Sequence, residues 1–387
     1  MVDLGAVAQH RMLVLARESR GITQGQLAEK MRSLDGAGAV SQGYVSRAEA
    51  GRLVVSGDRL ELYARAVDYP ARLLCLDELE IGAGPGLVHH RKRQATSASA
   101  LRRIHALLNL TRIQLRALTD GLPRPGKRGL PHLSVDDVYR PEDAAKAVRA
   151  TWGISPGPLP SVIGVLEDAG GLVVRRELLP PVSLDSGTDT VPVDAVSACP
   201  ANADPIMLLN MGTPAERQRF TVAHELGHMI MHAVPHPRQE MQADRFAAEL
   251  LMPERQIRGE LRTRLDITRL LELKMRWRVS MWALLRRART LGELSDWQYR
   301  SLAVGMSSLG YRTSEPAELD AETPVAVTVL IADQLRRGHT VERLARAAFL
   351  HLHEFTHVYL DDSLLHSDGL GKGVLSVSPA TSGGSSP

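Results

Sequence analysis

The sequence has few aromatic residues, only two cysteines and no long apolar run. Phenylalanine, tryptophan and tyrosine make up 4% of the 387 residues, so aliphatic side chains must fill the core. Cys75 and Cys199 lie far apart and form no metal-binding or redox motif, which suits a reducing cytoplasm. No signal peptide is recognisable, and no apolar run approaches the roughly 18 residues that cross a membrane. We therefore expect a cytoplasmic protein without a membrane partner, and not a secreted one.

Neither sign of charge dominates the chain. Lysine and arginine number 47 against 44 aspartate and glutamate residues, which gives a net charge of +3. Any affinity for nucleic acid must therefore come from a local patch and not from the whole chain. The hydrophobic share of 44% and the charged share of 24% are typical of globular proteins, and the length predicts two to three domains.

An H-E-x-x-H motif, His224-Glu225-Leu226-Gly227-His228, lies in an apolar stretch that predicts a buried helix. Four residues apart on a helix, His224 and His228 project from one face, where both can bind one Zn²⁺ about 2.0–2.1 Å away. Glu225 lies beside the first histidine, where it can take a proton from a water molecule that the metal activates. The motif therefore predicts a zinc hydrolase, with a peptidase favoured.

A catalytic zinc site also needs a third protein ligand and an open fourth position. The helix predicted over 239–252 carries Glu240 and Asp244 on one face, together with Ala243 and Ala247. The small alanines permit a close approach to the first helix, so we expect Glu240 to reach the metal. Asp244, one turn further, is placed to hydrogen-bond a ligand histidine.

Two further histidines and one glutamate near the motif are candidates for the same roles. His232 lies one turn past His228, where it can hydrogen-bond within the site, bind zinc, or polarise the scissile carbonyl as His236 also can. Glu240 explains more of the downstream pattern as the third ligand. Glu249 is nine residues from Glu240, on the opposite side of the helix, and is discounted.

A second H-E-x-x-H match, from His353 to His357, shows that the pattern alone decides nothing. No acidic helix follows it; Asp361, Asp362 and a tail rich in glycine and serine come next. We interpret this match as a surface helix that fits the pattern by chance.

The first motif points to a family. HELGHMIMH followed by E-x-x-A-D-R-F-A-A-E-L-L-M-P resembles the ImmA/IrrE family of zinc-dependent metallopeptidases. The resemblance implies that His224, His228 and Glu240 are zinc ligands and that Glu225 is the general base. Gln242 is a departure, because an acidic residue is common at that position in relatives.

The N-terminal 80 residues predict short amphipathic helices. Thr23 caps one helix with Gln26 as its capping-box partner, and a serine-capped helix begins at Ser41 and stops at Gly51. ITQGQLAEKM before SQGYVSRAEAG resembles an XRE/Cro-type helix-turn-helix, a lambda-repressor-like domain of the five-helix type. That resemblance implies that the second helix of the motif enters the major groove of a double-stranded operator.

The same resemblance implies which side chains meet DNA. They are Thr23, Gln24, Gln42, Gly43, Tyr44, Ser46 and Arg47. Thr23 and Gln24 would hold phosphates, whereas glutamine can pair with adenine and arginine with guanine. The alternative is a small helical protein-binding module in which the segment from Arg47 to Glu49 is merely solvated.

The rest of the chain divides by composition. A long amphipathic helix over 98–119 is interpreted as a connector or dimerisation helix, and because such DNA readers bind twofold sites we expect a homodimer. Strands before the zinc helix predict a small sheet, and 194–197 and 206–210 are candidates for an edge that aligns a peptide substrate.

The predicted fold class is mostly α with a small β-sheet, hence α+β: a helix-turn-helix domain, then a zincin-like domain with a helical C-terminal subdomain. The predicted divisions are 1–80 for the helix-turn-helix, 81–135 for linker and connector helix, 136–312 for the zinc peptidase, 313–366 for C-terminal helices and 367–387 for a disordered tail.

These features together predict a cytoplasmic transcription regulator. One end binds an operator, and the other cleaves a protein, either a repressor or the chain itself. A rival interpretation is a non-proteolytic repressor that uses the His/His/Glu site to hold or sense zinc. A third is a phage-type or toxin–antitoxin module whose main output is protein binding.

Overall fold

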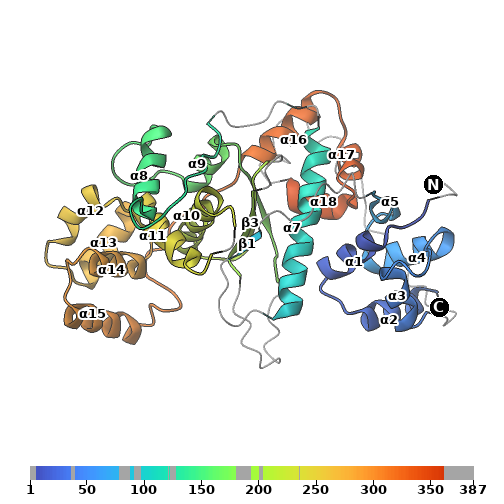
Figure 1. Ribbon diagram of the computed structural model, residues 1–387, viewed down its shortest axis with the longest axis horizontal. Helices are drawn as coiled ribbons and strands as arrows, with labels where there is room; N and C mark the ends of the chain where they lie inside the picture. The colour runs from blue at the N-terminus through green and yellow to red at the C-terminus, as the bar shows by residue number, and fades with distance from the viewer. Residues whose placement is uncertain are drawn as a thin grey trace, which may run out of the picture.

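Helices surround a small sheet in the computed structural model of the chain, which describes residues 6–35, 40–77, 88–90, 97–120, 122, 128–179, 193–199, 204–234 and 236–360 (Figure 1). The predicted class, mostly α with a small sheet, is confirmed. The predicted tail over 367–387 lies outside the described residues. None of the described helices is both long and apolar enough to cross a membrane.

The described residues from 6 to 77 form a cluster of five short helices. They are α1 (His10–Ser19), α2 (Gln24–Asp35), α3 (Gln42–Glu49), α4 (Gly57–Val67) and α5 (Ala71–Leu74). The capping box that begins α2 is confirmed, because the Gln26 amide donates to Thr23 Oγ1 at 3.2 Å and the Thr23 amide donates to Gln26 Oε1 at 2.8 Å. α3 begins at the Ser41 cap, whose hydroxyl accepts from the Tyr44 amide.

The sheet has four strands in the order β1-β3-β4-β2. They are β1 (Val88–His90), β2 (Leu172–Arg176), β3 (Ala195–Ala198) and β4 (Ile206–Asn210). β2 runs parallel to β4, whereas β3 runs antiparallel to both of its neighbours.

The prediction that 194–197 and 206–210 form an edge is wrong. β3 and β4 are the two inner strands, and β1 and β2 form the edges. Local hydrophobic periodicity does not specify which strands pair. The strand that covers β3 comes from residues 88–90, far away in the sequence, where a linker was expected.

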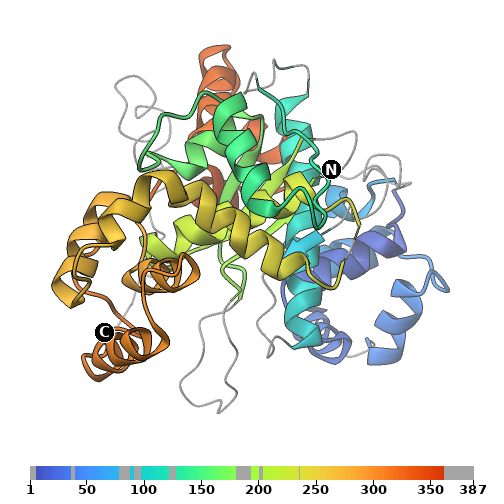
Figure 2. The same cartoon turned by 60° about the vertical axis from the view of Figure 1, so that its left-hand side comes forward.

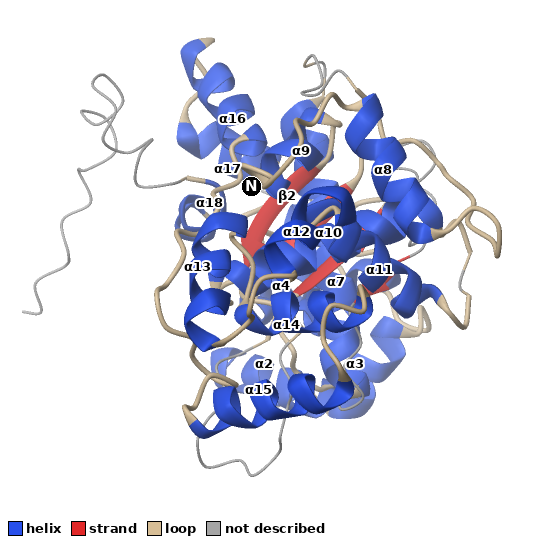
Figure 3. Ribbon diagram, turned by 90° about the vertical axis from the view of Figure 1, so that its left-hand side faces the viewer, coloured by secondary structure: helices blue, strands red, loops and turns tan. Residues whose placement is uncertain are grey.

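The two faces of the sheet belong to two separate apolar cores. On β4, Met207 and Leu209 point into one core while Ile206 and Leu208 point into the other, as the alternation of a strand requires. Figure 3 shows the strands enclosed between layers of helices. The sheet is therefore buried on both sides, which explains its continuous apolar sequence.

One face carries the helices of the H-E-x-x-H region. They are α8 (Pro141–Thr151), α9 (Val162–Asp168), α10 (Ala215–Met231), α11 (Gln239–Leu251), α12 (Glu254–Leu261), α13 (Ile267–Trp277), α14 (Met281–Thr290) and α15 (Asp296–Ser308). α12 to α15 lie at the end of the molecule opposite to α1–α5 (Figures 1 and 2).

The other face is covered by α7 (Ala98–Thr119) and the C-terminal helices. These are α16 (Ala326–Arg336), α17 (Val341–Ala347) and α18 (Leu352–Tyr359). The prediction of one long helix over 98–119 is confirmed. Its apolar side chains, such as Ile104 and Leu110, are buried in a core shared with α1 and the sheet, so they are not a free dimerisation face. The homodimer stays a prediction, as do the domain boundaries.

The second H-E-x-x-H match lies on α18, a surface helix with one exposed face and one buried face. Phe355 and Tyr359 are buried in the core, and the Glu354 side chain is only 13% exposed because it forms ion pairs. His353, by contrast, is 71% exposed. Helix α18 therefore lies at the surface with its apolar face on the core, and its glutamate forms ion pairs with Arg20 and Arg176.

Candidate metal centre and nucleic-acid interface

α10 carries the first H-E-x-x-H motif through the core. The helix begins after Pro214, which has no backbone N–H to donate. It ends before His232, whose backbone is extended. His224, Glu225 and His228 are all at most 1% exposed. Three titratable side chains are thus buried on one helix, which is costly unless each has a partner or a ligand.

Three potential metal donors converge between α10 and α11. The Nε2 atoms of His224 and His228 are 3.1 Å apart, and the Glu240 carboxylate oxygens lie 3.4 Å and 3.5 Å from them. Four donors arranged tetrahedrally about 2.0–2.1 Å from a zinc ion are about 3.3 Å apart. The donor set of two imidazoles and one carboxylate therefore fits a small divalent metal in both chemistry and spacing.

The outer nitrogen of each of these histidines has its own partner. His224 Nδ1 lies 2.8 Å from Asp244 Oδ1, and His228 Nδ1 lies 2.9 Å from His232 Nδ1. His232 Nε2 in turn lies 2.9 Å from Gln242 Oε1. When each Nδ1 donates to its partner, the Nε2 lone pairs of both rings face the same point, which is the tautomer a metal needs.

The charge state of His232 agrees with that arrangement, and Glu240 is an anion with or without a metal. Burial lowers the pKa of His232 to about 4, so its neutral ring can accept the proton of His228 Nδ1 near neutral pH. Burial raises the pKa of Glu240, but in the metal-free chain Nε2–H groups of His224 and His228 that donate to its carboxylate outweigh burial and hold that pKa well below its usual range. Glu240, whose side chain is 45% exposed, is therefore an anion on the solvent side of the three donors.

A serine of the sheet holds the Glu225 side chain in place. The Ser197 hydroxyl on β3 donates to Glu225 Oε2 at 2.6 Å, and Ser197 is fully buried. Glu225 Oε1 is also buried, and no residue that the structure describes hydrogen-bonds to it. One carboxylate oxygen is thus held by Ser197, while the other has no hydrogen-bond partner in the described part of the chain.

At the other end of the molecule, α3 is held against α1 and α2 by a polar network. Gln42 Nε2 donates to Gln24 Oε1 at 2.8 Å, and Gln24 Nε2 donates to Glu49 Oε2 at 2.9 Å. Glu49 is buried and accepts from Arg17 Nε at 2.6 Å and from the Tyr63 hydroxyl at 2.9 Å. The idea that Glu49 is merely solvated is therefore wrong.

Two regions of the chain match known families. Residues 171–289 match the model of a peptidase family, M78, described as the IrrE N-terminal-like domain. Residues 13–74 match the helix-turn-helix model. No curated protein matches the chain. The resemblances that the sequence suggested are confirmed, and one chain combines a DNA-binding helix-turn-helix with a peptidase-family domain.

The IrrE-like match runs from β2 to α14 and includes all three donors and Glu225. Sequence reasoning placed Asp244 against a ligand histidine, and the structure brings the two together. His232, for which several roles were open, contacts His228 instead of joining the three donors. His236 is exposed, and its Nδ1 accepts from the Arg238 amide.

Two residues of the IrrE-like site were missed or undervalued. Gln242 counted only as a departure from relatives, yet it completes the chain from His228 through His232. Ser197 had one signal, a hydroxyl within the otherwise apolar strand AVSA. Its partner Glu225 could not be found from spacing, because 28 residues separate them.

The helix-turn-helix residues differ in exposure. Thr23, Gln42 and Arg47 are exposed, whereas Tyr44 and Ser46 are half-buried. Tyr44 packs against the apolar core, so only part of its ring can reach a ligand. A Cβ at Gly43 would lie 3.5 Å from Arg47 Nη1, an ordinary contact. Residues 36–39 of the connecting loop lie outside the described residues.

The close approach of α10 and α11 gives a stability prediction. A Cβ at Gly227 would lie 3.0 Å from Phe246, a fully buried ring without room to move. We expect Gly227→Ala to lower the free energy of unfolding by about 1–2 kcal/mol through overpacking. The matched control is Gly259→Ala on α12, where nothing lies within 4 Å, and which should instead gain up to about 1 kcal/mol. Urea unfolding of both variants checks this, and equal gains would contradict it.

Proposed function

We propose that the protein is a DNA-binding transcription regulator whose zinc-dependent peptidase domain cleaves a regulatory protein, or the chain itself. The observation that carries the proposal is the convergence of His224 Nε2, His228 Nε2 and the Glu240 carboxylate, with Glu225 next to His224 in the chain. Substitution of Glu225 by glutamine tests it, because that change should stop hydrolysis without removing the metal.

The metal proposed for the site is Zn²⁺, held by His224, His228 and Glu240. Imidazole and carboxylate donors in this combination suit zinc, and three protein ligands leave a fourth position open. When bound, the metal would supply Lewis acidity that polarises a carbonyl and makes water acidic. Asp244 and His232 would hold the two histidine rings in the orientation that the metal needs.

Glu225 is the proposed general base. Ser197 holds Oε2, so Oε1 is the oxygen that can take the proton of the attacking water. The carboxylic acid so formed then gives the proton to the departing amine of the cleaved peptide bond. The carboxylate is regenerated, and the cleavage is balanced as the addition of one water molecule across an amide.

The proposed partner at the other end is a double-stranded operator. Arg47 is exposed on α3, and Gln42 lies at the start of that helix beside Gln24 of α2. This is the part of a helix-turn-helix that meets base edges, with α2 beginning at the phosphates. A twofold operator would bring two copies of the chain together, and a cytoplasmic location would give both parts access to their partners.

Arg47→Ala is expected to weaken operator binding. An arginine that pairs with guanine contributes about 1–3 kcal/mol of discrimination, so the dissociation constant should rise about 5–150-fold. Electrophoretic mobility shift with DNA fragments selected by the wild-type protein measures this. The matched control is Arg65→Ala, which removes an exposed arginine from α4 instead of α3. Equal retention by Arg47→Ala and wild type would show that α3 does not read the bases.

A non-proteolytic repressor that holds or senses zinc at the same donors is the rival function. The donor convergence by itself serves both functions, since a bound metal does not require turnover. What favours hydrolysis is the buried Glu225 Oε1, because a purely structural zinc site has no use for an unpartnered carboxylate oxygen.

A further inference from the structure

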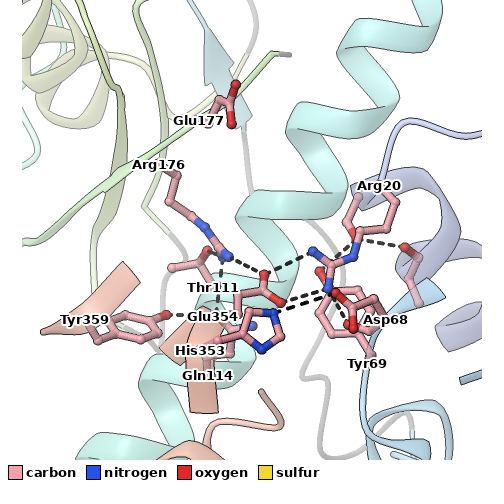
Figure 4. Close-up of polar contacts among 12 residues, drawn as sticks. Arg20, Asp68, Tyr69, Thr111, Gln114, Arg176, Glu177, His353, Glu354 and Tyr359 are labelled. Carbon is pink, nitrogen blue, oxygen red and sulfur yellow. Dashed lines mark hydrogen bonds and ion pairs between the residues drawn. The ribbon is translucent and has the colours of Figure 1, made fainter. Parts of the chain in front are cut away.

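The helix-turn-helix and the sheet meet across two arginines that share one carboxylate (Figure 4). Arg20 follows α1, Arg176 ends β2, and Glu354 of α18 lies between them. The Arg20 Nη1 and Nη2 atoms lie 3.2 Å and 2.8 Å from the two Glu354 oxygens, and Arg176 Nη2 lies 3.3 Å from Oε1. This is the glutamate of the second H-E-x-x-H match.

Each arginine is also tied to its own part of the molecule. Arg20 Nε donates to the Val67 carbonyl at 2.8 Å, and its guanidinium stacks 3.9 Å from the centre of the Tyr69 ring. Arg176 Nη1 donates to Thr111 at 2.9 Å and to Gln114 at 3.3 Å, both on α7. If the helix-turn-helix moved away from the sheet, Arg20 would therefore move with the first and Arg176 would stay with the second.

We propose that α18 is a latch, and that Glu354 holds the helix-turn-helix in one orientation against the peptidase body by bridging Arg20 and Arg176. The Arg176 side chain is 5% exposed and the Arg20 side chain 24%, so solvent screens their repulsion poorly. Without the carboxylate, two like charges face each other across the interface. The bridge therefore sets the orientation of α2 and α3 relative to the metal site.

The latch helix contacts both sides separately. Toward the body, Phe355 is buried and the Tyr359 hydroxyl donates to Gln114 Oε1 at 2.8 Å. Toward the helix-turn-helix, Glu354 contacts Arg20. The Asp68 carboxylate lies 3.9 Å from the exposed His353 ring and 3.8 Å from His351, which precedes α18. Apolar packing thus holds α18 against the sheet and α7, whereas its contacts with the helix-turn-helix are mainly between charged groups.

A hollow of about 1180 Å³ is lined by Asp68 of the helix-turn-helix together with residues of β2, α16 and α18. The packing of α1 on α7 also crosses the interface, and it is mainly apolar. An ion pair there joins Glu18 to Arg102, whose side chain is 58% exposed, and Arg72 stacks on the Phe349 ring. Loss of the latch should therefore loosen the orientation of the helix-turn-helix without unfolding it.

The test is hydrogen exchange on full-length Glu354→Gln, which keeps the shape of the side chain and removes its charge. Peptides covering 16–22 and 64–70 should exchange about threefold faster or more than in the wild type, while peptides of α10 and α11 keep their rates. The matched control is Glu342→Gln on α17, an exposed acid whose contacts lie within its own helix. It should leave every peptide unchanged.

Arg20→Gln is the second variant, because it leaves the Arg176–Glu354 pair intact and so preserves the body even if Glu354→Gln misfolds. It should speed hydrogen exchange in the same two segments. In the double variant, Arg20→Gln with Glu354→Gln, the change in exchange free energy should be smaller than the sum of the two single effects. Unchanged exchange in Arg20→Gln, or additive effects of the two substitutions, would overturn the latch. Neither readout depends on metal, DNA or cleavage, so the proposed function can fail separately.

Discussion

Cleavage is expected to fall by a factor on the order of 10²–10⁴ when Glu225 is replaced by glutamine, with zinc content unchanged. Glutamine has the size of glutamate and can still accept the Ser197 hydrogen bond, so the position of the side chain is kept. What it loses is the basic oxygen that takes a proton from water. The three proposed ligands, His224, His228 and Glu240, remain in place.

The measurement combines metal analysis with a search for products. Purified wild type and Glu225→Gln are compared for bound zinc by mass spectrometry. Cells expressing either form, in place of the native gene, are compared by N-terminal proteomics. New N-termini that occur only with the wild type identify the substrate, including self-cleavage if they lie in this chain.

The second H-E-x-x-H match offers a matched control for this experiment. His353→Ala removes a histidine from the same sequence pattern, but one that is 71% exposed and belongs to no group of three close metal donors among the described residues. It should leave both zinc content and products unchanged. If Glu225→Gln yields the same products as the wild type, the peptidase proposal is wrong. If Glu225→Gln also leaves the response of a target promoter intact, the result supports the non-proteolytic repressor.

The sequence predicted the parts of the site that depend on helical periodicity. His224 and His228 are one turn apart on α10, and Glu240 and Asp244 are one turn apart on α11, so their faces follow from spacing alone. The alanines between them allowed the helices to approach, and Gly227 against Phe246 shows how close that approach is. The three donors therefore met as expected.

Contacts between distant segments were beyond prediction. Ser197 reaches Glu225 because β3 lies under α10, and Glu354 reaches Arg20 across 334 residues. No periodicity encodes such pairings, since they depend on the order of strands and the packing of whole layers. The inner position of β3 was missed for the same reason, because its partner β1 comes from residues 88–90.

The second large effect concerns the metal itself. Glu240→Ala is expected to lose bound zinc on dialysis, whereas Asp244→Asn should keep zinc with an affinity about 10–100-fold lower. Glu240 would be a direct ligand, and its removal leaves two donors. Asp244 contacts His224 Nδ1 and only orients the ring and strengthens its basicity. Competition titration with a zinc-binding dye measures both affinities.

The same difference should appear in stability, because a ligand that binds only the folded chain stabilises it. At free zinc about 100 times the dissociation constant, the wild type should gain about 2.7 kcal/mol. Glu240→Ala should gain almost nothing, and Asp244→Asn should need a higher zinc concentration for the same gain. Met241→Ala, which removes an exposed neighbour of Glu240 outside the donor set, is the matched control and should behave as the wild type. If Glu240→Ala binds zinc as tightly as Asp244→Asn, the carboxylate of Glu240 is not the third ligand, and the site would have to be completed by another group.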